Sequence, residues 1–341
     1  MIARRLAAAA LLLALALPAL AQTGAKSKQQ TEAEETASAV VRVRSKSVPN
    51  ARSAATLGER REGSGVIVRE GYVATIGYLV IEAEAIEVTG ADGRTVPAAL
   101  AGYDHASGFG VLKLLAPLAG KPLPFGVSSA LTERQPALVA RHAGGEGLDF
   151  AIVQVVSRRA FSGSWEYLLD SAIYTYPPVL HWSGASLISG KGELLGLGSL
   201  IVADALGDAA DATAGSAAPG NLFVPVDLLK PILGELIERG RAPGPARPWL
   251  GMNTEESRGR LFVTRVSPEG PADRAGVKAG DVLIAIGGEE VGSLAEFYRK
   301  LWARGAAGVE VPLRVLQGLD AREFSLRSMD RTEYFRPARS Y

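Results

Sequence analysis

Short β-rich runs separated by turn-forming residues dominate the chain from Val40 onward, and they limit the folds it can adopt. The runs include VVRVRS, GSGVIV, GYVATIGYLV, AIEVTG, GVLKLL, PALVAR, FAIVQVVS and ELLGLGSLIV. Gly, Pro, Ser and Asp lie between them, and apolar residues at helical spacing are almost absent until Val226–Arg239, where we expect a helix. Many short strands at close spacing predict an all-β barrel or sandwich.

The chain is longer than a single hydrophobic core usually supports. Its 341 residues favour two domains. The stretch GRAPGPARP at Gly240–Pro248 is rich in Gly, Pro and Arg and indicates the boundary. The order of strands and helices after it predicts a smaller mixed α/β domain, with helices expected over PADRAG and over SLAEFYRKLWARG.

The N-terminus has the pattern of a secretory signal peptide, which we expect over residues 1–21. Arg4 and Arg5 precede the apolar run Leu6–Leu17, and Ala19–Ala21 supplies an A-x-A cleavage site. The run is too short to span a bilayer, although an uncleaved anchor is the alternative. We therefore expect a periplasmic protein with no integral membrane segment after cleavage, and a flexible polar leader over residues 22–38.

Composition excludes several kinds of chemistry. There is no cysteine, so disulfides, thiolate metal sites and a cysteine nucleophile are excluded. The 37 basic and 36 acidic residues give no electrostatic reason to expect a nucleic-acid partner. Of the three histidines, His105 and His142 are expected in exposed loops, and no acidic cluster accompanies them at metal-ligand spacing. We expect neither a metal nor a cofactor.

Several segments in order resemble the HtrA/Deg family of trypsin-like serine proteases with a C-terminal PDZ domain. They are GSGVIV, DGR, YDHASGFGVLKL, GKGELLGLGS, NLFVPVDLLKPIL and SPEGPADRAGVKAGDVLIAIGG. The resemblance implies an all-β chymotrypsin-like double β-barrel followed by a mixed α/β PDZ domain. The implied boundaries are 39–240 for the protease-like domain, 241–247 for a linker, 248–328 for the PDZ domain and 329–341 for a tail.

The same resemblance places other residues at two of the three catalytic positions. Tyr78 in TIGYLV stands where the family has its histidine base, and Gly108 in GFGVLK stands where the family has its aspartate. Ser183 in HWSGAS remains at the position of the nucleophile. A serine hydroxyl needs a neighbouring base to take its proton. A tyrosine, with a pKa near ~10, cannot serve at neutral pH, and glycine has no carboxylate.

The residue two places before Ser183 also departs from the family pattern. His181 stands where the resemblance implies a glycine whose backbone N–H contributes to the oxyanion hole. In an extended segment, side chains two residues apart lie on one face, so a rearranged pair of Ser183 and His181 is an alternative source of activity. We interpret Ser183 as a vestigial nucleophile.

The C-terminal part keeps the features of a PDZ domain. The resemblance identifies Leu250, Gly251 and Met252 as its carboxylate-binding loop. Backbone N–H groups there can receive a terminal carboxylate, while the peptide adds as a strand to the sheet edge. We expect these donors to have no acceptor within the domain. Phe297 and Leu301, one helical turn apart, are candidates to line the apolar pocket.

These patterns favour a non-catalytic homologue that binds polypeptide C-termini or unfolded proteins as an adaptor, regulator or chaperone. One alternative is a residually active serine endopeptidase of periplasmic quality control that uses Ser183. Another is a structural partner of an active HtrA paralogue. The resemblance also implies a homotrimer.

Overall fold

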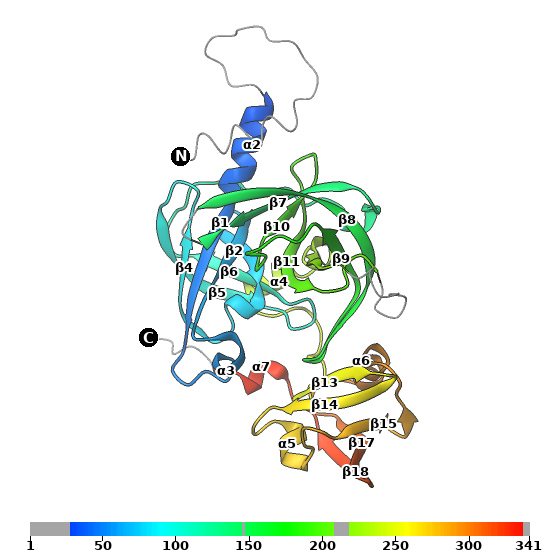
Figure 1. The fold of residues 1–341 in the computed structure, drawn as a ribbon. Coiled ribbons are helices and arrows are strands. Elements are labelled where there is room, and N and C mark those ends of the chain that lie inside the picture. Colours follow the sequence, from blue (N-terminus) through cyan, green and yellow to red (C-terminus); the bar gives the residue numbers. More distant parts are fainter. Residues whose placement is uncertain (1–27, 145–146, 208–217, 337–341) are drawn as a thin grey trace, which may run out of the picture. The chain divides into compact units, whose positions relative to one another are not determined.

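The computed structural model describes residues 28–144, 147–207 and 218–336 (Figure 1). Contacts divide the chain into two compact units. The first contains the residues up to Arg159 together with Ala172–Ala242, and the second contains Ala160–Ser171 and Pro243–Pro337. The expected signal peptide over residues 1–21 lies outside the described residues.

The first unit begins with a closed antiparallel barrel, whose strands run from blue to cyan in Figure 1. The order around the barrel is β1-β2-β3-β6-β5-β4. The strands are β1 (Val40–Ser47), β2 (Arg60–Arg69), β3 (Tyr72–Ile76), β4 (Ala83–Thr89), β5 (Thr95–Tyr103) and β6 (Phe109–Leu114). Inward-facing valines such as Val41, Val43 and Val66 are fully buried. The β-branched residues of the runs thus fill the barrel interior.

A second closed barrel follows in the order β10-β11-β12-β9-β8-β7. Its strands are β7 (Pro136–His142), β8 (Leu148–Gly163), β9 (Tyr167–Tyr176), β10 (Ser186–Ile188), β11 (Leu194–Val202) and β12 (Gly220–Pro225). An apolar cluster that includes Val139, Ile173, Leu187 and Phe223 forms its core. The turn between β8 and β9 lies within Ala160–Ser171, which belongs to the second unit.

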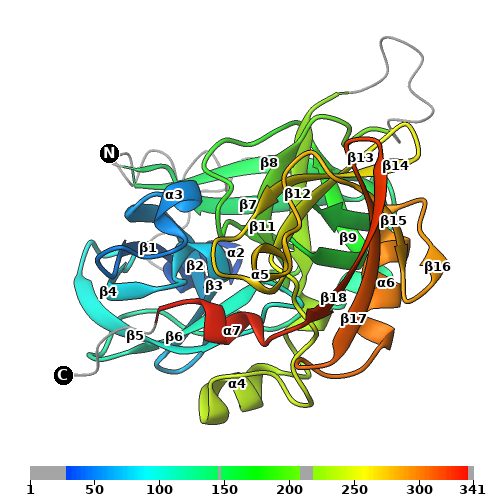
Figure 2. The same ribbon diagram turned by 90° about the horizontal axis from the view of Figure 1, so that it is seen from below.

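Helices in the first unit are short, and two of them differ from expectation. Lys28–Ala39 forms helix α2 where we expect a flexible leader, because Gln, Glu, Lys and Ala are good helix formers. The helix expected over Val226–Arg239 is divided into the 3₁₀ turn η4 (Val226–Leu228) and α4 (Leu233–Arg239). Pro231 lies between them and cannot donate a helical hydrogen bond. Helix α4 lies against β5 and β6 (Figure 2).

The remaining short helices of the first unit are α3 (Ala54–Leu57), η1 (Gly77–Leu79) and η2 (Ser128–Ala130). Of these, η1 directly follows β3 and holds Tyr78, so it positions one of the residues singled out in the sequence.

The second unit contains an antiparallel sheet with the order β13-β14-β15-β17-β18, with β16 paired to β15. Its strands are β13 (Met252–Ser257), β14 (Arg260–Val266), β15 (Val282–Ile286), β16 (Glu289–Glu290), β17 (Glu310–Gln317) and β18 (Asp320–Arg327). Its helices are α5 (Pro271–Ala275), α6 (Leu294–Ala303) and α7 (Arg331–Tyr334). The hydroxyl of Ser293 caps α6 by accepting from the N–H of Glu296 at 3.2 Å. The expectation of helices over both segments is confirmed.

Part of the expected tail over residues 329–341 packs onto the sheet. Met329 and Trp249 exchange two backbone hydrogen bonds of 3.1 Å, and the rings of Tyr334 and Trp249 lie 4.7 Å apart. The aromatic contact orders the chain through α7.

The predicted fold class, a chymotrypsin-like double β-barrel followed by a mixed α/β PDZ-like sheet, is confirmed. Within the described part of the chain, no helix is both long and apolar enough to cross a bilayer.

Candidate functional site

Ser183 lies on a tight turn between β9 and β10, and the first barrel holds this turn in place. The N–H of Ser64 in β2 donates to the carbonyl oxygen of Ser183 at 2.8 Å. Gly184 has φ 70, and a Cβ atom there would lie 1.9 Å from the carbonyl oxygen of Ser64. Gly63 allows the same close approach, because a Cβ atom at that position would lie 2.6 Å from the carbonyl oxygen of Ser183. The two barrels therefore meet at the serine through glycine contacts that no other residue allows.

Tyr78 contacts the serine directly. Its hydroxyl lies 2.8 Å from Ser183 Oγ and 2.8 Å from the carbonyl oxygen of Ser199. A phenol has one proton and a carbonyl oxygen can only accept, so donation to Ser199 leaves Ser183 to donate to Tyr78. Burial raises the pKa of Tyr78 to about 12, although hydrogen bonds with Ser183 and Trp182 act to lower it. Tyr78 is therefore neutral at physiological pH and cannot take the serine proton.

Gly108 lies beside η1 but contributes only backbone. Its carbonyl oxygen accepts from the N–H of Gly77 at 2.7 Å, and its φ is 80. The carboxylate of nearby Asp104 is engaged within its own turn, where it accepts from Ser107 Oγ at 2.6 Å and from the Ser107 N–H at 2.8 Å. The structure thus brings Tyr78 and Ser183 together and supplies no carboxylate from position 108.

We expect the Tyr78→Phe substitution to destabilise the protein by about 1–3 kcal/mol. The change removes one hydroxyl and leaves Ser183 and the Ser199 carbonyl without their shared partner. Urea denaturation followed by circular dichroism measures this free energy. Tyr176→Phe is the matched control, because Tyr176 is an exposed residue of β9 and its substitution should change stability little. Equal effects of the two substitutions would contradict the role of the Tyr78 hydroxyl in stability.

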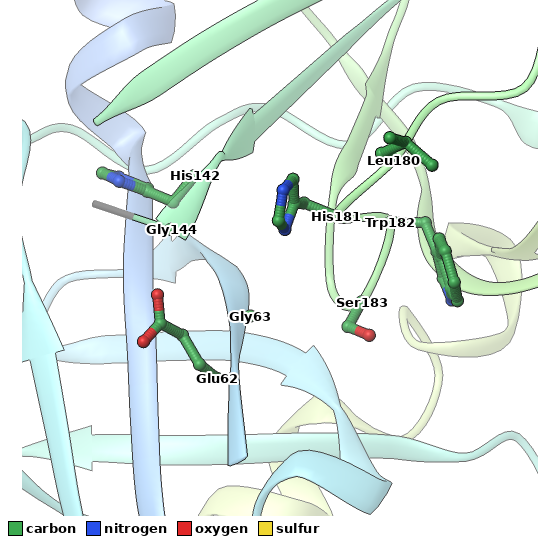
Figure 3. Close-up of a pocket in the computed structure, with 8 residues that line it drawn as sticks. All are labelled: Glu62, Gly63, His142, Gly144, Leu180, His181, Trp182 and Ser183. Atoms are coloured by element: carbon green, nitrogen blue, oxygen red, sulfur yellow. The ribbon is translucent and has the colours of Figure 1, made fainter. Parts of the chain in front are cut away.

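A pocket of about 500 Å³ opens beside the serine (Figure 3). Its lining residues are Glu62, Gly63, His142, Gly144, Leu180, His181, Trp182 and Ser183. His181 is exposed and has φ 55, in the left-handed region that glycine adopts without steric cost. The Ser183 hydroxyl points away from the His181 ring in Figure 3, so the two do not form a pair in this arrangement.

The other two histidines differ in their surroundings. The expectation of an exposed loop for His142 is wrong: it ends β7, is 7% exposed, and its backbone N–H donates to Ser64 Oγ at 2.8 Å. Burial lowers the pKa of His142 below that of an ordinary imidazole. His105 is half-buried, with its ring edge-on to Tyr103 at 4.4 Å. Among the described residues, no group of three His, Asp or Glu side chains could hold a metal ion.

The second candidate site is the loop Leu250–Met252 in the other unit. Its three backbone N–H groups converge on one carboxylate, that of Glu166. Glu166 Oε1 accepts from Leu250 at 3.2 Å, from Gly251 at 2.7 Å and from Met252 at 3.1 Å, and Oε2 accepts from Leu250 at 2.9 Å. From the sequence we expect these donors to have no acceptor within the domain at 248–328; their acceptor, Glu166, lies outside those bounds. Their acceptor comes from Ala160–Ser171, far from the loop in sequence.

Comparisons with known proteins identify two types of domain in the chain. Residues 63–197 match the model of a trypsin-like peptidase domain, and residues 248–327 match that of a PDZ domain. The probable periplasmic serine protease do/HhoA-like of Haemophilus influenzae is 29% identical over 272 residues, covering 75% of this chain and 55% of the relative. Periplasmic serine endoprotease DegP of Escherichia coli is 28% identical over 250 residues, covering 68% of this chain and 50% of DegP. The chain is thus similar to HtrA/Deg serine proteases.

Solved structures give the same fold. HtrA-type protease AlgW with a decapeptide has a TM-score of 0.53 and 21% sequence identity, over 90% of this chain and 98% of AlgW. The chain spans about half to two thirds of the length of the curated relatives it matches.

The predicted pocket residues Phe297 and Leu301 are fully buried on α6. They belong to the same apolar cluster as Leu168 from the Ala160–Ser171 segment. Sequence reasoning missed Glu166 and Tyr298. The Tyr298 hydroxyl donates to the carbonyl oxygen of Gly163 at 2.7 Å, and burial raises the pKa of this phenol. No sequence motif marks Glu166, because 84 residues separate it from Leu250.

Proposed function

We propose that this HtrA/Deg homologue is a non-catalytic polypeptide-binding protein of the periplasm. Its PDZ unit would bind the C-terminal carboxylate of peptides or unfolded proteins, and its double barrel would serve as a scaffold in an adaptor, regulatory or chaperone role. The observation that carries the proposal is the hydrogen bond of 2.8 Å between Ser183 Oγ and the neutral phenol of Tyr78, where a serine protease needs a base.

The cost of the missing groups supports the absence of catalysis. Loss of the nucleophile–base unit lowers turnover on the order of 10⁶-fold in such enzymes. Loss of one oxyanion donor costs about a further 10²–10³-fold. The second loss belongs to the proposal because His181 stands where the resemblance implies the glycine of the oxyanion hole. Its backbone is in a left-handed conformation. Together these losses leave no useful rate of peptide hydrolysis.

The carboxylate held by Leu250–Met252 supports a peptide-binding role. Three backbone N–H groups that bind the Glu166 carboxylate have the spacing to donate to the carboxylate of a peptide C-terminus. AlgW, which has a similar fold, has been solved with a decapeptide. β13 follows this loop directly and is the outermost strand of its sheet, the position at which a peptide strand adds.

We expect the mature protein to leave unfolded casein intact between about pH 6 and about pH 10. Tyr78 keeps its proton throughout this range, because its pKa of about 12 lies above it, and therefore never becomes a base. Gel electrophoresis over several hours measures the loss of substrate, and a fluorophosphonate probe measures the reactivity of Ser183. Ser183→Ala is the control. Cleavage or labelling that disappears in Ser183→Ala would overturn the proposal in favour of a residually active endopeptidase.

A further inference from the structure

The second unit contains its own carboxylate ligand. Glu166 sits in the turn between β8 and β9 and is only 5% exposed. Its four hydrogen bonds with Leu250, Gly251 and Met252 use the donors that a peptide terminus would need. Burial raises the pKa of Glu166 to about 7, whereas these backbone donors and the guanidinium of Arg331 have the opposite effect.

The backbone around Glu166 also follows the path expected of a bound strand. The N–H of Thr254 in β13 donates to the carbonyl oxygen of Ser164 at 2.8 Å. The residue that supplies the carboxylate therefore lies two positions after the residue that makes the strand contact. On the other side, the Tyr298 hydroxyl of α6 accepts from the Glu166 N–H at 3.2 Å and donates to the Gly163 oxygen. The segment lies between the edge of β13 and helix α6, as an added peptide strand would.

Further contacts hold the segment on either side of Glu166. Leu168 is 8% exposed and belongs to the apolar core cluster of this unit. The carbonyl oxygen of Trp165 accepts from Arg331 at 3.0 Å, and Asp170 pairs with Arg299 at 2.6 Å. Glu166 itself has φ 57, a left-handed conformation that a residue with a Cβ keeps only when its surroundings compensate the cost. The contacts of Trp165, Leu168 and Asp170 stabilise the docked segment and compensate this cost.

We infer that the peptide groove of this homologue is occupied by its own segment Gly163–Leu168, with Glu166 in place of a ligand's terminal carboxylate. An external peptide then binds only when this segment has left the groove. The inference rests on the proposed peptide-binding function and describes its regulation. Because the segment is part of the same chain, its effective concentration at the groove is high. The apparent affinity for an external peptide falls by the fraction of molecules that are open.

Hydrogen exchange in the absence of any peptide tests the occupancy directly. In the full mature chain we expect the amides of Leu250, Gly251 and Met252 to exchange at least about tenfold faster in Glu166→Gln than in the wild type. The amide of glutamine is neutral and replaces one of the two acceptor oxygens by an NH2 group, so the charge-assisted hydrogen bonds are lost and the docked state is weakened. Glu333→Gln is the matched control, since Glu333 is an exposed acidic residue of α7 in the same unit. Amides of β17 report that the sheet remains folded.

The second measurement is fluorescence polarisation with a labelled peptide that ends in Val-Leu and has a free carboxylate. We expect its Kd to be at least about tenfold lower for Glu166→Gln than for the wild type, while Glu333→Gln behaves as the wild type. Glu166→Asp keeps the charge but withdraws the carboxylate by one methylene. It should give an intermediate Kd, and it provides a second test if Glu166→Gln does not fold.

The outcomes separate the inference from the proposed function. Unchanged exchange at Leu250–Met252 in both Glu166 variants would overturn self-occupancy. Equal, measurable peptide affinities in wild type and variants would also overturn it, and the proposed peptide binding would stand. Faster exchange without peptide binding by any variant would support self-occupancy and reject the proposed function.

Discussion

The double variant Tyr78→His/Gly108→Asp is expected to leave unfolded casein uncleaved, although it introduces the base and the acid that the family resemblance implies at these positions. The reason lies at position 181. A tetrahedral intermediate needs backbone donors aimed at its oxyanion. The family resemblance implies that one of them belongs to the residue two places before the serine. That residue is His181, whose φ of 55 is normally a glycine conformation. Gly108 also has a φ of 80, so an aspartate there adopts a strained backbone.

We expect that cleavage also needs His181→Gly, and that the triple variant exceeds the double variant by about 10²–10³-fold in kcat/KM. A quenched fluorescent casein measures both rates. The control is the triple variant with Ser183→Ala, which should show no more cleavage than the wild type. Robust cleavage by the double variant alone would show that the oxyanion argument is wrong. A triple variant as inactive as the double would show that these three positions do not suffice.

The parts of the molecule that follow from local sequence could be predicted. The barrels follow from β-branched runs between turn residues, and the helices of the PDZ unit follow from a Pro at the start of α5 and a Ser cap on α6. The positions of Tyr78 and Ser183 came from motifs, and the structure places their hydroxyl oxygens 2.8 Å apart. Each of these features depends on residues that are close together in the chain, or on short motifs that follow one another in the same order as in the family.

Features that depend on distant parts of the chain could not be predicted. The glycines beside His142 predict a loop. In the structure the residue is buried, and its N–H donates to Ser64 Oγ of the other barrel. Glu166 reads as an ordinary acidic turn residue, because nothing in its neighbourhood indicates three backbone donors more than 80 residues away. A buried carboxylate is stabilised only by partners that the fold brings together, and those partners here are backbone groups, which carry no sequence signal.

Peptide binding by the PDZ unit is expected to depend on a free C-terminal carboxylate. The measurement compares free-acid and amidated versions of one peptide with an apolar C-terminus by fluorescence polarisation. It uses the mature chain in its wild-type form and as Glu166→Gln, in which the Leu250–Met252 donors are no longer engaged by Glu166. A carboxylate accepts charge-assisted hydrogen bonds from these donors, and each is stronger than its neutral counterpart. An amidated terminus loses that charge and directs N–H groups at other N–H groups.

We therefore expect the amidated peptide to bind at least about tenfold more weakly to Glu166→Gln, a difference of about 1.4 kcal/mol. In the wild type the same ratio should hold with both affinities reduced, because displacement of the Gly163–Leu168 segment affects both peptides equally. The ratio of the Kd values of the two peptides thus reports the carboxylate contact. The change in both Kd values between the wild type and Glu166→Gln reports the internal ligand. Equal affinities of the two peptides for Glu166→Gln would reject the carboxylate clamp, and internal segments of unfolded chains would then be the ligands to test.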